Sequence, residues 1–135
     1  MIYLDATAVV KLVRFEAESP ALSDWLESNA AAPLVSSALV EVEVARALRR
    51  VAPEALGGLG SVLARLPRAE VTAAVRARAA AYPGALLRSP DAIHLATAEI
   101  LGERPGMQLD AFVTYDARLA EAAAALGLPT ASPGL

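Results

Sequence analysis

The sequence contains no cysteine. A disulfide framework, a zinc site built from thiolates and a cysteine nucleophile are therefore excluded. Aromatic residues make up only 4% of the chain, which disfavours a β-sandwich or β-barrel and gives no sign of an aromatic platform for stacking bases. These absences remove several classes of fold and of site before any motif is considered.

Long uncharged apolar runs are also missing. No segment reaches the roughly 20 residues that a membrane span requires. The first residues, MIYLDATAVV, have no basic stretch before Asp5, which is unlike a signal peptide. We therefore expect a cytoplasmic protein with no membrane association.

A positive net charge is a third absence. The chain carries a net charge of −3, so its surface as a whole would not attract a nucleic acid. Such binding would need a local basic patch, or metal ions that invert the charge of an acidic pocket.

The chain is rich in apolar residues, because 56% of its 135 residues are hydrophobic and many of these are alanine. We expect one compact, helix-rich domain over residues 1–135.

Short strands are predicted to alternate with longer helices. Apolar runs predict strands at residues 2–4, 33–36, 68–72, 111–114 and 128–130. Helices are predicted at residues 8–15, 22–26, 37–51, 54–66, 73–82, 90–101 and 117–126. Ser36 or Ser37 would cap the third helix, and Ser89 would cap the helix that starts at Pro90. The alternation predicts an α/β fold with helices on both faces of a short-stranded, mainly parallel sheet.

Four acidic residues stand where such a fold would bring them together. Asp5 and Asp116 each follow a predicted strand, whereas Asp91 lies in the first turn of the helix predicted at residues 90–101. Glu43 lies early in the helix that follows the second strand. Ligands of parallel α/β sheets bind at the carboxyl ends of the strands. Each acid alone could be a helix cap or a solvated side chain, so it is their coincidence at one edge that indicates a site.

Lysine and histidine could contribute little to balancing such a cluster. The only lysine is Lys11 and the only histidine is His94. Two carboxylates about 4 Å apart repel by roughly 4 kcal/mol at an effective dielectric constant of 20, so a cluster of four needs protons or bound cations. Ligands that are all oxygen suit Mg²⁺, or alternatively Mn²⁺, and these ions support reactions of phosphodiesters. The residues alone predict a cation site without choosing between phosphate reactions.

Two further polar residues lie close to these acids in the sequence. Thr7 could donate a hydrogen bond to a carboxylate or to a bound water, or could simply cap its helix. His94 follows Asp91 by one helical turn, which raises the possibility of a metal ligand. An isolated histidine in an apolar helix is more often a hydrogen-bonded packing residue, and the sequence leaves both interpretations open.

Four segments of the chain resemble, in order, the motifs of PIN-domain ribonucleases of the VapC toxin type. These segments are IYLDATAVVKL, SALVEVEVARALRR, SPDAIHLATA and AFVTYDARLAEAAAALGLP, and they cover most of the chain. The resemblance implies a three-layer α/β/α fold and a Mg²⁺-dependent endoribonuclease that hydrolyses RNA by metal-activated water. It also implies the toxin of a type II toxin–antitoxin system, a VapB-like antitoxin as partner, and a homodimer.

The same resemblance assigns residues to the site. Asp5, Glu43, Asp91 and Asp116 become the catalytic, metal-binding acids, and Thr7 matches the hydroxyl position after the first of them. An acid just before V-x-R-A-L selects Glu43 over Glu41, which lies roughly 200° away around a helix and is expected to be solvated or ion-paired.

The T-x-D pattern of residues 114–116 likewise selects Asp116 over Asp110. Asp110 precedes the fourth predicted strand and Asp116 follows it, so the two lie at opposite ends of that strand. We expect Asp110 to be a residue at the start of the strand, with no part in the site.

Binding of RNA also requires cationic side chains. Five on the first and third predicted helices are candidates for phosphate contacts: Lys11, Arg14, Arg46, Arg49 and Arg50. The alternative is that these side chains are ordinary solvated residues. At the level of the whole protein, the alternative to a nuclease is a non-catalytic PIN-like scaffold, or a module that binds RNA or protein.

Overall fold

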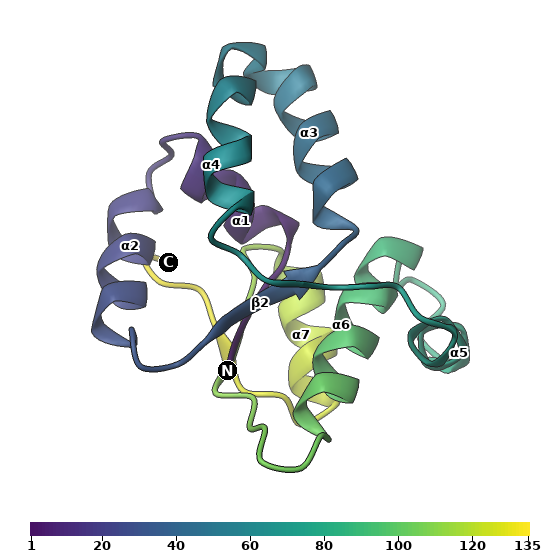
Figure 1. Ribbon diagram of the computed structural model, residues 1–135. Helices are drawn as coiled ribbons and strands as arrows, with labels where there is room; N and C mark the ends of the chain where they lie inside the picture. Colours follow the sequence, from purple (N-terminus) through teal and green to yellow (C-terminus); the bar gives the residue numbers. More distant parts are fainter.

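A five-stranded parallel sheet forms the centre of the molecule (Figure 1). The computed structural model describes residues 1–135. The strands are β1 (Ile2–Leu4), β2 (Leu34–Ser37), β3 (Arg68–Ala69), β4 (Ala111–Val113) and β5 (Thr130–Ala131). Their order is β3-β2-β1-β4-β5, and all four neighbouring pairs are parallel. The prediction of a short-stranded parallel sheet is confirmed, with β1 in the central position.

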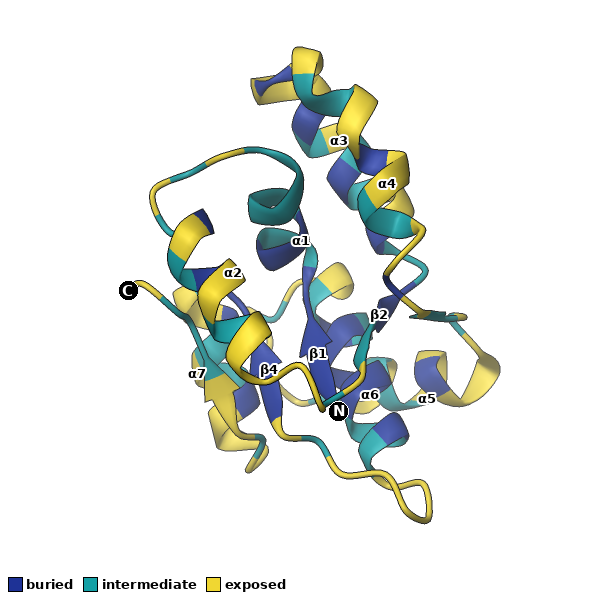
Figure 2. Cartoon of the chain, turned by 60° about the vertical axis from the view of Figure 1, so that its left-hand side comes forward, coloured by how far each residue is buried: buried dark blue, intermediate teal, exposed yellow.

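Helices cover both faces of the sheet, which makes three layers (Figures 1 and 2). One face packs against α1 (Ala6–Val13), α2 (Ser19–Ser28), α3 (Val40–Val51) and α4 (Leu59–Leu63). The other face packs against α6 (Ser89–Gly102) and α7 (Ala117–Ala125), and α5 (Ala73–Ala81) lies against α6. The predicted three-layer α/β/α architecture is therefore confirmed.

The central strand is buried on both faces, as Figure 2 shows by its dark blue colour. Because side chains alternate along a strand, Ile2 and Leu4 join the core under α1 to α4. Tyr3 points to the other side and joins the core under α6 and α7. Asp5 follows directly after β1, and its carboxylate contacts Thr7 and Ala8 of α1 and Thr114 after β4.

Several predicted elements differ from the structure, among them the last strand, which forms at residues 130–131 and not at 128–130. In place of one helix over residues 54–66, the chain forms a 3₁₀ helix (Pro53–Gly58) followed by the short α4. Gly57, Gly58 and Gly60 explain the difference, since glycine costs about 1 kcal/mol relative to alanine inside a helix. The strand predicted at residues 68–72 is confined to β3 because only Ser36 and Ser37 of β2 pair with it.

The predicted serine caps are wrong. Helix α3 begins at Val40 without a side-chain cap, and Ser36 Oγ instead donates to the carbonyl of Leu4 on the neighbouring strand, at 2.6 Å. Ser89 lies inside the first turn of α6, where Arg88 is the residue at the cap position.

None of the helices is long and apolar enough to cross a membrane.

Candidate active site

Two acids begin helices at the carboxyl ends of adjacent strands. Asp5 follows β1 and caps α1, because its Oδ1 accepts a hydrogen bond from the backbone N–H of Ala8 at 3.0 Å. Asp116 follows β4 and caps α7 in the same way, with its Oδ1 accepting from the N–H groups of Arg118 at 2.9 Å and Leu119 at 3.2 Å. Since β1 and β4 are parallel neighbours, both acids lie at one edge of the sheet.

Asp5 is the most buried of the acids, with only 2% of its surface exposed. Thr7 Oγ1 donates to its Oδ1 at 2.6 Å, which is one of the roles that the sequence left open, and Thr114 Oγ1 donates to its Oδ2 at 2.5 Å. Burial raises the pKa of Asp5 above its ordinary value, although the bonds from Thr114, Thr7 and Ala8 oppose that rise. An ionised Asp5 would therefore be stabilised by a nearby cation.

The two threonines also join the turns that carry the acids. Thr7 Oγ1 accepts from the backbone N–H of Tyr115 at 2.8 Å, and Thr114 Oγ1 accepts from that of Asp116 at 3.1 Å. The turn between β1 and α1 is thus held against the turn between β4 and α7. Thr114 was not among the predicted site residues, although the T-x-D pattern that selected Asp116 contained it.

Asp91 lies in the first turn of α6 and is joined to Asp116 through an arginine. Arg88 Nε lies 3.2 Å from Asp91 Oδ2, and another nitrogen of the same guanidinium lies 3.3 Å from Asp116 Oδ2. These two carboxylates raise the pKa of Arg88, so the side chain stays charged. Arg88 was missed by the sequence interpretation, because nothing local shows that a side chain before α6 reaches the end of β4.

Glu43 contacts His94 rather than another acid. Its Oε1 lies 2.6 Å from His94 Nε2, and the other ring nitrogen, Nδ1, lies 2.7 Å from the hydroxyl of Tyr3. His94 is 1% exposed and Tyr3 is fully buried, whereas the Glu43 side chain keeps 23% of its surface exposed. His94 is thus a hydrogen-bonded, buried residue that reaches a predicted site acid. Tyr3 had not been predicted to take part.

The acids are brought to one region, but they do not form a ready-made cluster. Hydrogen bonds and ion pairs connect Asp5 through Thr114 to Asp116, and then through Arg88 to Asp91. No group of three or more histidine, aspartate or glutamate side chains is placed to hold a metal ion. The guanidinium of Arg88 is the cation between two of them.

Oxygen atoms that could bind a cation nevertheless remain available. Asp5 Oδ2, Glu43 Oε2 and Asp91 Oδ1 each keep at least one lone pair that makes no hydrogen bond within the protein. In both Asp5 and Asp116, each carboxylate oxygen already has at least one partner. The available donors are all oxygen, as Mg²⁺ and Mn²⁺ prefer, so the chemistry of the residues fits such an ion.

Two acids that the sequence analysis set aside lie elsewhere. Glu41 forms an ion pair with Arg68 at 3.2 Å, which confirms its predicted role. Asp110 pairs with the terminal amino group of Met1 at the start of β4, opposite the site. The assignment of Glu43 and Asp116 to the site stays a prediction.

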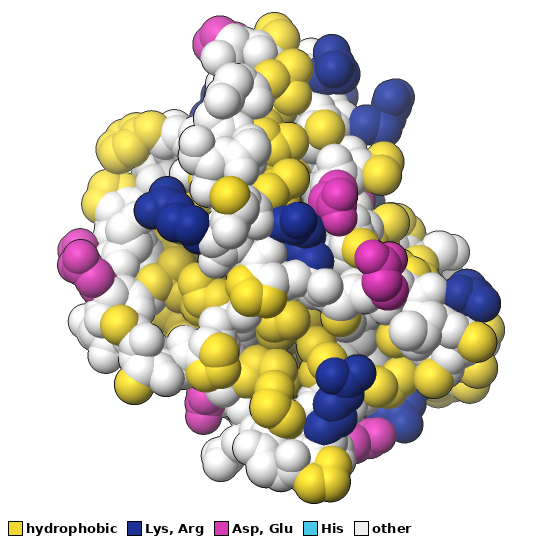
Figure 3. Space-filling view, in the orientation of Figure 1, with side chains coloured by type: hydrophobic (Ala, Val, Ile, Leu, Met, Phe, Trp, Pro, Cys, Tyr) yellow, Lys and Arg dark blue, Asp and Glu magenta, His cyan; other side chains and the backbone are white.

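The five predicted RNA-binding side chains fall into two groups. Lys11 lies 2.7 Å from Glu18 and 3.3 Å from Glu16, and Arg14 lies 3.7 Å from Glu16, so their charges are already balanced. On α3, Arg46, Arg49 and Arg50 are exposed and form no salt bridge. Figure 3 shows basic side chains gathered along α3. This helix therefore carries both Glu43 and three free positive charges.

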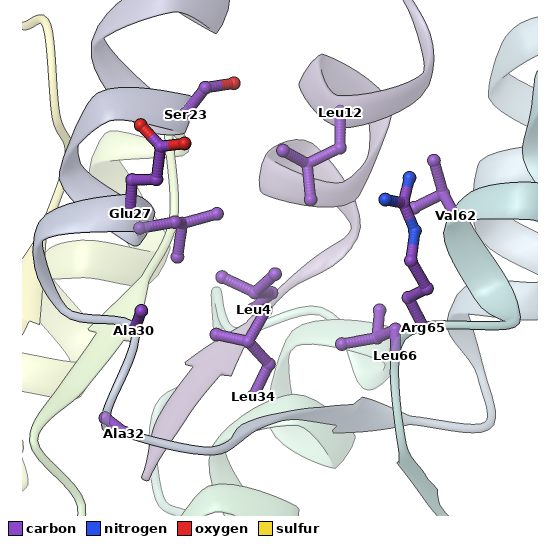
Figure 4. A pocket seen from close by; sticks show the side chains of 11 residues that line it. Leu4, Leu12, Ser23, Glu27, Ala30, Ala32, Leu34, Val62, Arg65 and Leu66 are labelled. Carbon is purple, nitrogen blue, oxygen red and sulfur yellow. The ribbon is translucent and has the colours of Figure 1, made fainter.

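Two hollows of the surface differ in their lining. An open groove of about 920 Å³ includes Arg88, Asp91, Asp116 and Arg118 in its lining. A separate pocket of about 480 Å³ lies between α1, α2 and α4, lined mainly by leucine and alanine side chains (Figure 4). Glu27 and Arg65 are the only ionisable residues of that pocket, so of these two hollows only the groove is lined by predicted site acids.

Comparison with known proteins agrees with the fold and the motifs. Residues 2–125 match the PIN domain. The chain belongs to the PIN-domain family. Within that family it belongs with the VapC ribonucleases, since it is 54% identical to Ribonuclease VapC35 of Mycobacterium tuberculosis over 99% of this chain and 98% of that protein.

Other relatives agree with this placement. Ribonuclease VapC46 of the same organism is 41% identical over 98% of this chain and 97% of its own length. The crystal structure of Mycobacterium tuberculosis VapC20, a sarcin–ricin loop cleaving toxin, superposes with a TM-score of 0.74 at 18% identity, covering 98% of this chain and 100% of VapC20. At that identity the superposition shows the shared fold.

Proposed function

We propose that the chain is a Mg²⁺-dependent endoribonuclease, the toxin of a type II toxin–antitoxin system. The observation that supports this most directly is the buried Asp5, held by two threonines at the edge of the sheet where Asp91 and Asp116 also lie. The names of the relatives, all ribonucleases, point to RNA as the substrate. Hydrolysis of a phosphodiester at such a site needs no nucleophilic side chain.

In this proposal Asp5, Glu43, Asp91 and Asp116 would hold Mg²⁺, which when bound supplies an activated water and balances negative charge on the reacting phosphate. The other residues serve these acids. Thr7 and Thr114 hold the Asp5 carboxylate in one orientation, and His94 holds Glu43. Arg88 balances the charge of Asp91 and Asp116 and must yield at least part of these contacts when a metal ion binds.

The test is cleavage of RNA by the purified protein with Mg²⁺ and with EDTA. Wild type should cleave only with Mg²⁺, and Asp5→Asn should lose at least a hundredfold in rate because the buried charge is gone. The matched control is Asp24→Asn, which removes an exposed acid of α2 that has no ion pair. Cleavage by Asp5→Asn at the wild-type rate would overturn the assignment.

A second candidate function is a PIN-like module that binds RNA or protein without cleavage. The observation in its favour is that Arg88 bridges two of the acids and that no three acids are gathered for a metal ion. The same experiment separates the two functions. A pure scaffold would bind RNA with and without Mg²⁺ and leave it intact.

The partners follow from the same proposal. A VapB-like antitoxin would neutralise the enzyme, and RNA would be its substrate. The homodimer and the cytoplasmic location stay predictions. The RNA that is cleaved, and the sequence at the cleavage site, have to be found by experiment.

A further inference from the structure

His94 has both ring nitrogens occupied by partners from other elements. Nε2 faces Glu43 of α3 at 2.6 Å, and Nδ1 faces the hydroxyl of Tyr3 on β1 at 2.7 Å. The ring itself belongs to α6 and is 1% exposed. The imidazole thus joins β1, α3 and α6. Of the three side chains, only Glu43 is partly exposed to solvent.

The chemistry of the partners decides where the imidazole proton lies. An ionised carboxylate can only accept hydrogen bonds, so the contact with Glu43 requires a proton on Nε2. In a neutral ring Nδ1 is then an acceptor, and the Tyr3 hydroxyl donates to it.

Tyr3 is itself held firmly. Its ring stacks on Phe112 of β4 with a centroid distance of 5.2 Å and an angle of 4° between the ring planes. The ring also meets His94 edge-on, at 5.8 Å and 76°. Because β1 is the central strand and all of its residues are buried, the Tyr3 ring has little freedom to move.

We propose that Tyr3 is a positioning residue that fixes His94 as the Nε2–H tautomer, so that His94 orients Glu43 and is not a metal ligand. Glu43 Oε1 is then occupied by His94, and Oε2 is left to face the cation. This inference rests on the proposed function, in which Glu43 holds Mg²⁺. Such partners of metal ligands typically contribute about 10–100-fold in affinity or activity.

The first test is spectroscopic and uses the fact that His94 is the only histidine. A two-bond ¹H–¹⁵N correlation spectrum of the uniformly ¹⁵N-labelled protein distinguishes a protonated ring nitrogen from an unprotonated one. We expect the Nε2–H tautomer without Mg²⁺ and the same tautomer at saturating Mg²⁺. If Nε2 bound the metal, it would lose its proton and the Nδ1–H tautomer would appear. That result, or a ring with protons on both nitrogens, would overturn the proposal.

The second test removes the Tyr3 hydroxyl. Tyr3→Phe keeps the stacked ring but takes away the donor to Nδ1, so we expect about 10-fold weaker Mg²⁺ binding by calorimetry and a similar fall in kcat with KM for RNA unchanged. The matched control is Tyr82→Phe, which removes a hydroxyl that donates to Glu99 elsewhere on α6. Wild-type Mg²⁺ affinity in Tyr3→Phe, with melting temperature unchanged, would show that the hydroxyl does not act on the site.

A double-mutant cycle separates positioning from packing. His94→Gln retains an N–H donor for Glu43 but has no tautomer to fix, so Tyr3→Phe should change Mg²⁺ affinity much less in that background. Equal effects of Tyr3→Phe in both backgrounds would overturn the relay through His94. If wild type cleaved no RNA at all, the proposed function would fail, whereas the tautomer and its response to Mg²⁺ would still be measurable.

Discussion

Asp5 is a carboxylate in a place where water hardly reaches. Burial raises its pKa above the ordinary value of 3.8, despite three hydrogen bonds that favour the charged form. A raised pKa means that the folded chain binds this proton more tightly than the unfolded chain does. The resulting stability is present below the unfolded pKa and is lost as the pH rises through the folded pKa. At neutral pH the ionised Asp5 therefore costs stability in the metal-free protein.

This argument predicts that Asp5→Asn stabilises the metal-free protein at pH 7. Its melting temperature should be a few degrees above that of wild type, because the buried charge is removed while the Ala8 cap can be kept. The advantage should shrink as the pH falls toward 4, where wild-type Asp5 is increasingly protonated. Thermal denaturation in EDTA across this pH range measures the difference, with Asp24→Asn as the control. A lower melting temperature for Asp5→Asn at pH 7 would contradict the prediction.

At the scale of elements, α3 combines the site with charges that could hold RNA. Glu43 lies in its first turn, and Arg46, Arg49 and Arg50 follow on exposed positions. With a rise of about 1.5 Å per residue, Arg49 lies roughly 9 Å along the axis from Glu43. In the proposed function, phosphates next to the cleaved one would therefore be within reach of these arginines.

We predict that Arg49→Ala weakens RNA binding and lowers its dependence on salt. Each lost phosphate contact reduces the slope of log affinity against log salt by about 0.7 for a single strand. Binding is measured in the Asp5→Asn background, which prevents cleavage. The control is Arg104→Ala, an exposed arginine just beyond the opposite end of α6. Equal affinities of the Arg49→Ala and control proteins across the salt series would rule out a contact at Arg49.

The elements also show what the sequence can and cannot predict. Parallel strands and helices followed from apolar runs, and Asp5 could be placed because an acid directly after a strand lies at the sheet edge. The sequence could not show that β3 ends at Ala69, because the length of this strand depends on how far its partner β2 extends.

Contacts distant in sequence were equally hidden. Tyr3 and His94 are 91 residues apart, and Arg88 and Asp116 are 28 apart. Neither pair leaves a local pattern in the sequence. The motifs therefore located the acids, while the side chains that hold or balance them became visible only in the folded chain.

At the scale of the whole molecule, the site is built around the centre of the sheet. The backbone N–H of Asp5 donates to the carbonyl of Val113 at 3.1 Å, directly continuing the pairing of β1 with β4. The strands on either side, β2 and β4, are themselves flanked by β3 and β5. Asp5 therefore follows the strand that is separated by one strand from each of the two lateral strands, β3 and β5.

The central place of β1 has a consequence for how the protein opens. Segments at the periphery, such as α5, can fray while the rest of the fold persists, but the amide of Asp5 can be exposed only when the sheet itself separates. Its hydrogen exchange should therefore be as slow as that of Tyr3 and Phe112, and should report the global free energy of unfolding. Exchange at Asp5 as fast as in α5 would contradict this view. A protein arranged in this way loses the surroundings of Asp5 and its fold in the same event.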